Sequence, residues 1–141
     1  MKRILIPVKD TSKNIDVIEE AVKIVDKFEG TITLLHVDNI HLILRELQYG
    51  NDVAKGPEID ENDRKELLKK VSDEYKKKNI NVESKVLVGD PAEEIIKEAE
   101  SGDYDLIIMR THGMSATKRF MLGSVTDKVV HHVKKPIMVV R

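Results

Sequence analysis

The chain has 141 residues, of which 40% are apolar, 35% charged and 4% aromatic, a composition that predicts one globular domain over residues 1–141 with an aliphatic core. Its 24 basic and 25 acidic residues give a net charge of −1, so no basic excess is present to attract nucleic acid. The lack of cysteine excludes disulfides and thiolate zinc sites, and the apolar runs are too short for a signal peptide or a membrane span, so we expect a cytoplasmic protein.

The N-terminal part of the chain alternates between strand and helix patterns. Residues 3–8 and 31–37 are short aliphatic runs, typical of strands that are covered on both faces of a parallel sheet. Between them, apolar residues recur every three or four positions over residues 15–28, which predicts a helix. The segment 38–60 is too long for a passive turn, and we expect a mobile excursion with one short helix.

The middle of the chain continues this alternation. Residues 61–78 show a helical period among many charges, and residues 91–100 predict a second surface helix. That helix follows Asp90, a good N-cap residue, and has Pro91 at its first position. Residues 82–88 alternate between apolar and polar side chains, which indicates an edge strand.

Two further strands and a helix complete the predicted order. Residues 104–109 and 136–140 are aliphatic runs, and the helix between them is expected to begin at Ser124, whose hydroxyl would cap the amide of Asp127. Strands and helices thus alternate along the whole chain. This order predicts right-handed crossovers and a doubly wound α/β sheet.

Ligands of open α/β sheets bind beyond the C-terminal ends of the strands. We expect residues 7–10, 37–38 and 110–113 to meet there, next to a helix that begins at residues 123–126. Free amides, a glycine and two hydroxyls at a helix start suit a phosphate group. In the structural alternative, the glycines serve a tight turn and the serine only caps a helix. Neither Gly-x-x-x-x-Gly-Lys-Ser/Thr nor Gly-x-Gly-x-x-Gly is present.

Four stretches together resemble a single-domain universal stress protein: ILIPVKDTSKNIDVIEEAVKIV, TLLHV, GDPAEEIIKEAESGDYDLIIMRTHG and LGSVTDKVVHHVKKPIMVVR. The resemblance covers almost the whole chain. It implies a three-layer α/β/α fold, similar to that of the adenine nucleotide alpha hydrolases, with a doubly wound five-stranded parallel sheet of strand order 3-2-1-4-5. It also implies a homodimer formed by the C-terminal strand 136–141. The alternative for that aliphatic strand is a central or covered position.

Many members of this family bind ATP through the motif Gly-x2-Gly-x9-Gly-Ser/Thr. Gly113, followed nine residues later by Gly123-Ser124, reproduces the second part of the motif, whereas Arg110 occupies the place of the first glycine. The family's Pro-x-Asp pattern in the first loop also differs, because Lys9 stands in the place of the acid and Asp10 follows it. The bulk of Arg110 opposes a close approach of the backbone, while its charge favours phosphate.

The resemblance implies an ATP site, or a site for another adenine nucleotide, with or without Mg²⁺. The nucleotide-binding residues that it implies are Pro7, Val8, Lys9, Asp10, Val37, Met109, Arg110, His112, Gly113, Gly123, Ser124, Val125 and Thr126. No catalytic residue and no protein metal ligand is assigned, so at most slow hydrolysis is expected. His36 and His41 have no recognisable partners in the sequence.

The resulting hypothesis is a homodimeric, nucleotide-binding regulatory switch of the stress response that acts on a protein partner. The alternative is a universal stress protein that binds no nucleotide and serves as a dimeric protein-interaction module, as Arg110 and Lys9 favour. A third interpretation, a phosphoacceptor receiver domain, requires clustered carboxylates after the first strand. Asp10 stands nearly alone there, and Asp90 is better explained as a helix cap.

Overall fold

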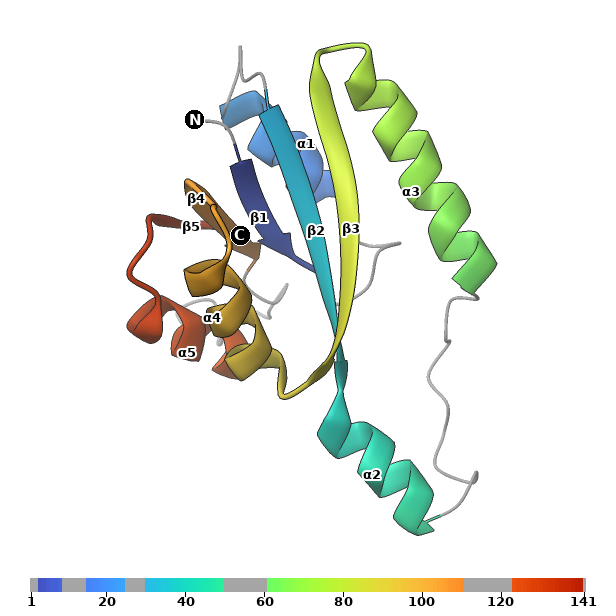
Figure 1. Cartoon of the computed structure of the whole chain (residues 1–141), viewed down its shortest axis with the longest axis vertical. Coiled ribbons are helices and arrows are strands. Elements are labelled where there is room, and N and C mark those ends of the chain that lie inside the picture. Colours follow the sequence, from blue (N-terminus) through green and yellow to red (C-terminus); the bar gives the residue numbers. More distant parts are fainter. Residues whose placement is uncertain (1–2, 9–14, 25–29, 50–60, 111–122, 141) are drawn as a thin grey trace, which may run out of the picture.

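The computed structural model describes residues 3–8, 15–24, 30–49, 61–110 and 123–140. Within them lies a five-stranded sheet in the order β3-β2-β1-β4-β5 (Figure 1). All four strand pairings are parallel. The strands are β1 (Arg3–Pro7), β2 (Gly30–Asn39), β3 (Ile80–Gly89), β4 (Leu106–Arg110) and β5 (Ile137–Val140). The helices are α1 (Ile15–Ile24), α2 (Ile40–Tyr49), α3 (Glu61–Lys76), α4 (Pro91–Ser101) and α5 (Ser124–His132). The predicted fold class and strand order are confirmed.

The sheet is covered on both faces, as continuous apolar strands require. Ile4, Leu5 and Ile6 of β1 are each completely buried, yet they belong to two different cores because successive side chains of a strand point to opposite faces. The first core joins alternate strand residues to Ile18 and Ala21 of α1 and to Val71 and Tyr75 of α3. The second joins the remaining strand residues to Ala92, Ile95 and Ala99 of α4 and to Val129 of α5.

The two outer positions of the sheet are held by β3 and β5. The prediction of an edge strand at residues 82–88 is confirmed, and β3 extends further at both ends, from Ile80 to Gly89. The second strand is also longer than predicted, because β2 pairs with β3 as far as Asn39, opposite Gly89. The continuous pairing with β3 therefore extends β2 beyond its apolar run, which covers residues 31–37.

The expected short helix within segment 38–60 is present as α2, which follows β2 directly. Residues 50–60 lie outside the described residues. Figure 1 shows α2 beyond the C-terminal end of β2, away from the layers that cover the sheet. No helix of the described ranges combines the length and the apolarity needed to cross a bilayer.

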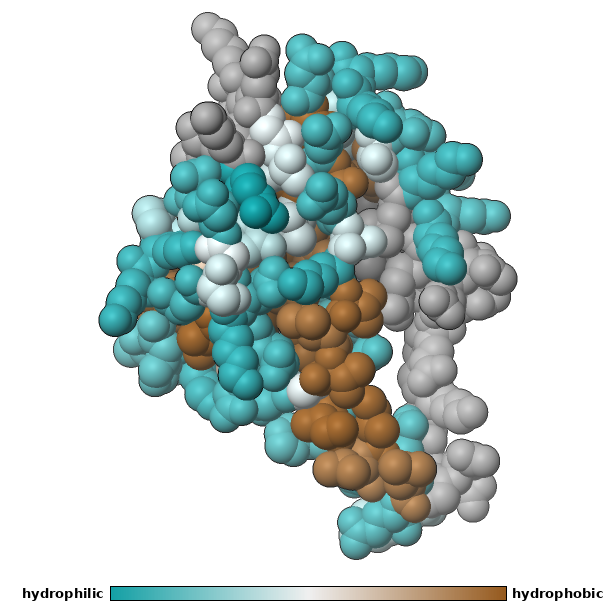
Figure 2. Space-filling model, in the orientation of Figure 1, coloured by the Kyte–Doolittle hydropathy of each residue, from teal (hydrophilic) through white to brown (hydrophobic). Residues whose placement is uncertain are grey.

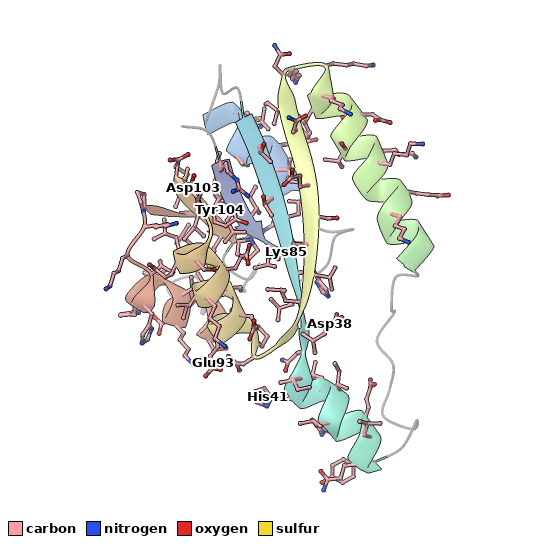
Figure 3. All side chains as sticks on the ribbon, viewed as in Figure 1. Asp38, His41, Lys85, Glu93, Asp103 and Tyr104 are labelled. Carbon is pink, nitrogen blue, oxygen red and sulfur yellow. The ribbon has the colours of Figure 1, made fainter. Side chains whose placement is uncertain are left out.

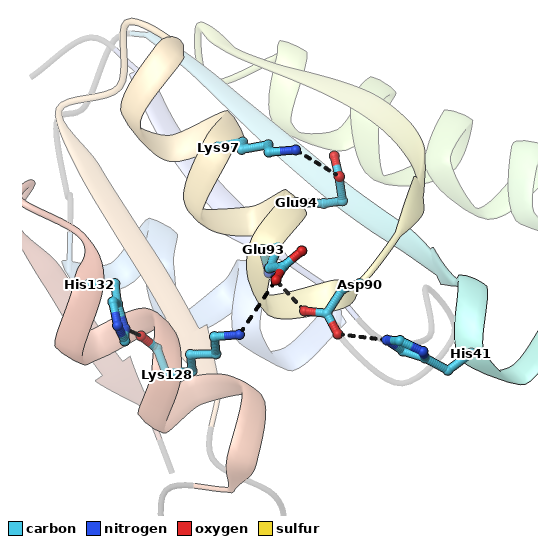
Figure 4. Close-up of polar contacts among 7 residues, drawn as sticks. All are labelled: His41, Asp90, Glu93, Glu94, Lys97, Lys128 and His132. Atoms are coloured by element: carbon cyan, nitrogen blue, oxygen red, sulfur yellow. Dashed lines mark hydrogen bonds and ion pairs between the residues drawn. The ribbon is translucent and has the colours of Figure 1, made fainter.

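The start of α4 confirms the predicted cap. Asp90 Oδ2 accepts the amide of Glu93 at 3.1 Å, and Pro91 occupies the first helical turn. Asp90 Oδ1 lies 3.1 Å from His41 Nε2 of α2, so one carboxylate serves both helices (Figure 4). The bond from the Glu93 amide, together with His41 and Lys128, lowers the pKa of Asp90. The expectation that His41 has no partner is wrong. The sequence did not indicate this pair because His41 and Asp90 are 49 residues apart.

A half-buried carboxylate joins α4 to β3 and to the start of β4. Glu98, whose side chain is 12% exposed, accepts Lys85 Nζ at 2.8 Å and the Tyr104 hydroxyl at 2.9 Å. The Arg3 guanidinium lies over the Tyr104 ring, 4.9 Å from its centroid. Burial by itself raises the pKa of Glu98, but the hydrogen bonds from Lys85 and Tyr104 outweigh it, and the pKa lies below its ordinary value of 4.5.

Replacing Glu98 by Gln is expected to lower the free energy of unfolding at pH 7 by about 1–2 kcal/mol, because the amide loses the charge-assisted bonds. A lowered pKa means that the carboxylate stabilises the fold above its ordinary pKa of 4.5 and loses this effect as the pH falls through its folded-state pKa. The difference between wild type and Glu98→Gln should therefore vanish in acid. Urea unfolding at pH 7 and at acid pH measures both values.

Glu93→Gln on the same helix is the control, since Glu93 is 61% exposed and its ion pair with Lys128 spans 3.9 Å. It is expected to change the free energy of unfolding by less than about 0.5 kcal/mol. An equal effect of the two substitutions at pH 7 would contradict the role given to Glu98.

Candidate functional site

The polar end of the sheet lies where β1 and β4 stand side by side. After β1 the chain leads to α1, which packs on one face, and after β4 it leads to α5, which packs on the other. The two connections thus diverge at neighbouring strand ends. This is the switch point at which open α/β sheets bind ligands.

The end of β1 is held by two bonds from β2. The amide of Val8, a buried residue, donates to the carbonyl of Leu35 at 2.8 Å, and the carbonyl of Val8 accepts from His36 Nδ1 at 3.2 Å. His36 Nε2 lies 2.9 Å from Asp38 Oδ1. His36 therefore ties the end of β1 to β2.

The end of β4 is tied to the start of α5 in a similar way. Thr126, which is 5% exposed, donates its hydroxyl to the carbonyl of Arg110 at 3.2 Å. The Thr126 hydroxyl therefore donates its proton within the protein and not to a ligand. The exposed hydroxyl at the helix start is that of Ser124.

The N-terminus of α5 differs from the predicted cap. Ser124 is the first helical residue, and the N-cap is Gly123, whose carbonyl accepts the amide of Asp127 at 2.9 Å. The prediction that the Ser124 hydroxyl caps Asp127 is wrong. Gly123 has φ 86°, a conformation that glycine adopts without strain. It makes no side-chain cap. The first turn of α5 therefore begins without a side-chain acceptor from its cap residue and carries the partial positive charge of a helix start.

Arg110 closes β4, where it pairs with Val140 of β5. Among the described residues, positive φ values occur only at Asn79 and Gly123. The arginine that stands in place of the motif glycine therefore imposes no positive-φ strain on the backbone here. Its side chain is partly buried.

Three of the implied nucleotide contacts are part of the second core. Met109 is 4% exposed, and Val37 and Val125 are partly buried against the same cluster. Packing alone explains these residues, so their apolar character is not specific to a ligand. The structure does bring together the described members of the implied site at the ends of β1, β2 and β4 and the start of α5. Lys9, Asp10, His112 and Gly113 lie outside the described residues.

The sequence placed Asp38 near this edge, but it did not reveal the partners of His36. His36 and Asp38 are two positions apart on β2, and side chains at this spacing share one face of a strand. That spacing is the signal that indicates the pair, but the third member, the carbonyl of Val8, comes from another strand. Figure 3 shows Asp38 and His41 at the junction between β2 and α2. Within the described part of the chain, no group of three or more side chains is arranged to hold a metal ion.

A family model for universal stress proteins matches residues 1–141. The universal stress protein MJ0531 of Methanocaldococcus jannaschii is 27% identical over 140 residues, which cover 99% of this chain and 82% of that protein. The solved structure of MJ0577, from the same organism, matches with a TM-score of 0.69 at 31% identity and covers 99% of this chain and 94% of that one. A family protein from Arabidopsis thaliana, solved with AMP bound, has a TM-score of 0.61 at 18% identity, with 99% of this chain and 91% of that one covered. The chain belongs to the universal stress protein family.

Proposed function

We propose that the protein binds an adenine nucleotide at the C-terminal edge of its sheet and acts as a regulatory switch in a stress response. One observation carries the proposal: the start of α5 lies at the switch point with a positive-φ glycine at its cap and an exposed Ser124 beside it. The AMP found in a protein of the same fold supports adenine as the base. ATP is the preferred candidate, with or without Mg²⁺.

The phosphates are assigned to the start of α5. Gly123 lacks a Cβ, so an oxygen can approach its backbone, and the first amides of the helix donate toward an anion. The Ser124 hydroxyl adds a donor. Arg110 at the end of β4 and Lys9 shortly after β1 are two cationic residues whose positive charge favours a phosphate tail.

Binding rather than rapid chemistry is proposed, because the acid–base pair at the site is already engaged. His36 has a side chain that is 15% exposed, and both of its ring nitrogens have partners. A general base needs a free nitrogen within reach of the proton that it abstracts. The nucleotide then acts by biasing the loops around it between two arrangements that a partner protein distinguishes.

The second candidate is a protein-interaction module without nucleotide, favoured by the arginine and lysine at positions where the family motif has glycine and aspartate. Both candidates share a homodimer. We propose that β5 forms it, because β5 is the last strand of the sheet and its residues Ile137–Val140 are only partly buried. A partly exposed aliphatic edge strand pairs readily with a copy of itself.

Titration with ATP, with and without Mg²⁺, should give saturable binding at sub-millimolar concentrations. This corresponds to a binding free energy of at least about 4 kcal/mol, within reach of a few charge-assisted phosphate bonds. Isothermal titration calorimetry of the nucleotide-free protein provides the measurement. Absence of saturation for ATP, ADP and AMP alike would favour the interaction module.

Gly123→Val is expected to weaken nucleotide binding at least about tenfold, because a β-branched residue at positive φ displaces the backbone and covers the amides. Ser124→Ala, which leaves the backbone unchanged, should weaken binding by about three- to tenfold, the equivalent of one hydrogen bond. The control is Ser101→Ala, which removes a hydroxyl at the far end of α4. Circular dichroism verifies that each variant is folded. Wild-type affinity in Ser124→Ala and Gly123→Val would exclude α5 as the phosphate site.

Val139→Glu on β5 should halve the mass of the assembly in solution, since each copy would place a carboxylate on the shared edge. Lys134→Glu, at an exposed position before the strand, serves as the control and should leave the mass unchanged. Sedimentation equilibrium measures both. A wild-type mass for Val139→Glu would remove β5 as the interface.

A further inference from the structure

Helix α2 is apolar yet exposed. Its sequence IHLILRELQY has apolar or aromatic residues at six of ten positions, and none of the ten is buried. Leu47 is 77% exposed, Leu42 57% and Leu44 55%. A helix that is apolar around most of its circumference is normally buried. The sequence of α2 is therefore that of a covered helix, while its place in the fold is exposed.

The apolar surface does not end with the helix. Val86 and Val88 of β3, on the face of the sheet that α1 and α3 cover elsewhere, are 50% and 57% exposed. Figure 2 shows apolar side chains running without a break from the lower part of β3 across α2. We call this the α2–β3 surface, and its members are Leu42, Ile43, Leu44, Leu47, Val86 and Val88.

The size of this surface points to a protein partner. From the exposed fractions, its side chains offer on the order of 600 Å² of apolar area, at the upper limit of the largest patches on monomeric proteins. A standard interface buries about 800 Å² on each partner, and in homodimers about 65% of it, or roughly 500 Å², is apolar. The α2–β3 surface alone thus supplies the apolar share of one homodimer interface.

We propose that the α2–β3 surface binds a second copy of this chain around a two-fold axis. In such an isologous contact the same patch lies on both partners, so the apolar area of one copy is matched by that of the other. The two charged side chains of α2, Arg45 and Glu46, are of opposite sign. When α2 of one copy meets α2 of the other, these two charges therefore cancel within each helix. They can lie at the polar rim of the contact.

The helix is also held in place for such a contact. His41 makes two hydrogen bonds that orient the first turn of α2. Its amide donates to Asn39 Oδ1 at 3.0 Å, and its ring Nε2 lies 3.1 Å from Asp90 Oδ1. These bonds connect α2 to the end of β2 and to the start of α4. The surface is independent of the β5 edge, because β3 and β5 lie at opposite ends of the sheet. A closed assembly that uses both contacts is a tetramer made of two β5 homodimers.

Leu47→Glu is expected to halve the mass of the assembly and to raise the dissociation constant of this contact at least tenfold, because a carboxylate replaces the most exposed apolar side chain of the surface. Gln48→Glu is the matched control: it adds the same charge at the next position of the same helix and should leave the mass unchanged. Sedimentation equilibrium over a range of protein concentrations measures the effect. Leu47→Glu combined with Val139→Glu should give a monomer, which separates this contact from that of β5.

The lack of cysteine in the chain permits a second, direct test. Leu47→Cys with a short bismaleimide should yield cross-linked pairs in good amount, whereas Lys97→Cys, at an exposed position of α4, should yield few. Equal cross-linking of the two variants, together with an unchanged mass for Leu47→Glu, would overturn the proposal. So would an unchanged mass with a lowered free energy of unfolding in Leu47→Glu, since the leucine would then pack within its own chain.

Discussion

The parallel sheet of this protein must be covered on both faces, and this constraint determines the rest of the structure. Ile4, Leu5 and Ile6 are all completely buried, which is possible only if helices pack on each side. The chain therefore passes to one face after β1 and to the other after β4. The divergence leaves strand ends, amides and a helix start together at one edge of the sheet. The site is a consequence of how the core is buried.

Polar contacts at that edge hold the elements at a defined spacing. The bond from His36 to the carbonyl of Val8 joins β2 to the end of β1, and the bond from Thr126 to the carbonyl of Arg110 joins α5 to the end of β4. Each bond gives a hydrogen-bond donor to a carbonyl at a strand end. The start of α5 is thus positioned by side chains that are not themselves free to contact a ligand. The residues that position these elements are therefore different from Ser124 and Gly123, for which we propose phosphate contacts.

Beyond the end of β2, the same chain extends a helix that covers neither face of the sheet. The bond between His41 and Asp90 makes this arrangement specific, since the carboxylate that begins α4 also holds the first turn of α2. The contacts with the Glu93 amide and His41 lower the pKa of Asp90, so they stabilise its charged form. Protonation of Asp90 in acid would therefore weaken both contacts. The exposed leucines of α2 and the proposed nucleotide site are joined through β2 and the start of α4. A partner on α2 and a ligand at the sheet edge therefore contact connected elements.

Local patterns in the sequence determined most of the elements and the family. Aliphatic runs marked the strands, Asp90-Pro91 marked the start of α4, and the glycine and serine spacing indicated a phosphate site, because each depends on neighbours in the chain. Only the tertiary structure decided the length of β2, the change of cap from Ser124 to Gly123, and the partners of His36 and His41. Each of these rests on a register or a contact between residues distant in sequence. Segment 38–60 shows the same limit: its apolar pattern predicted a helix, but the pattern could not tell that the fold leaves that helix exposed.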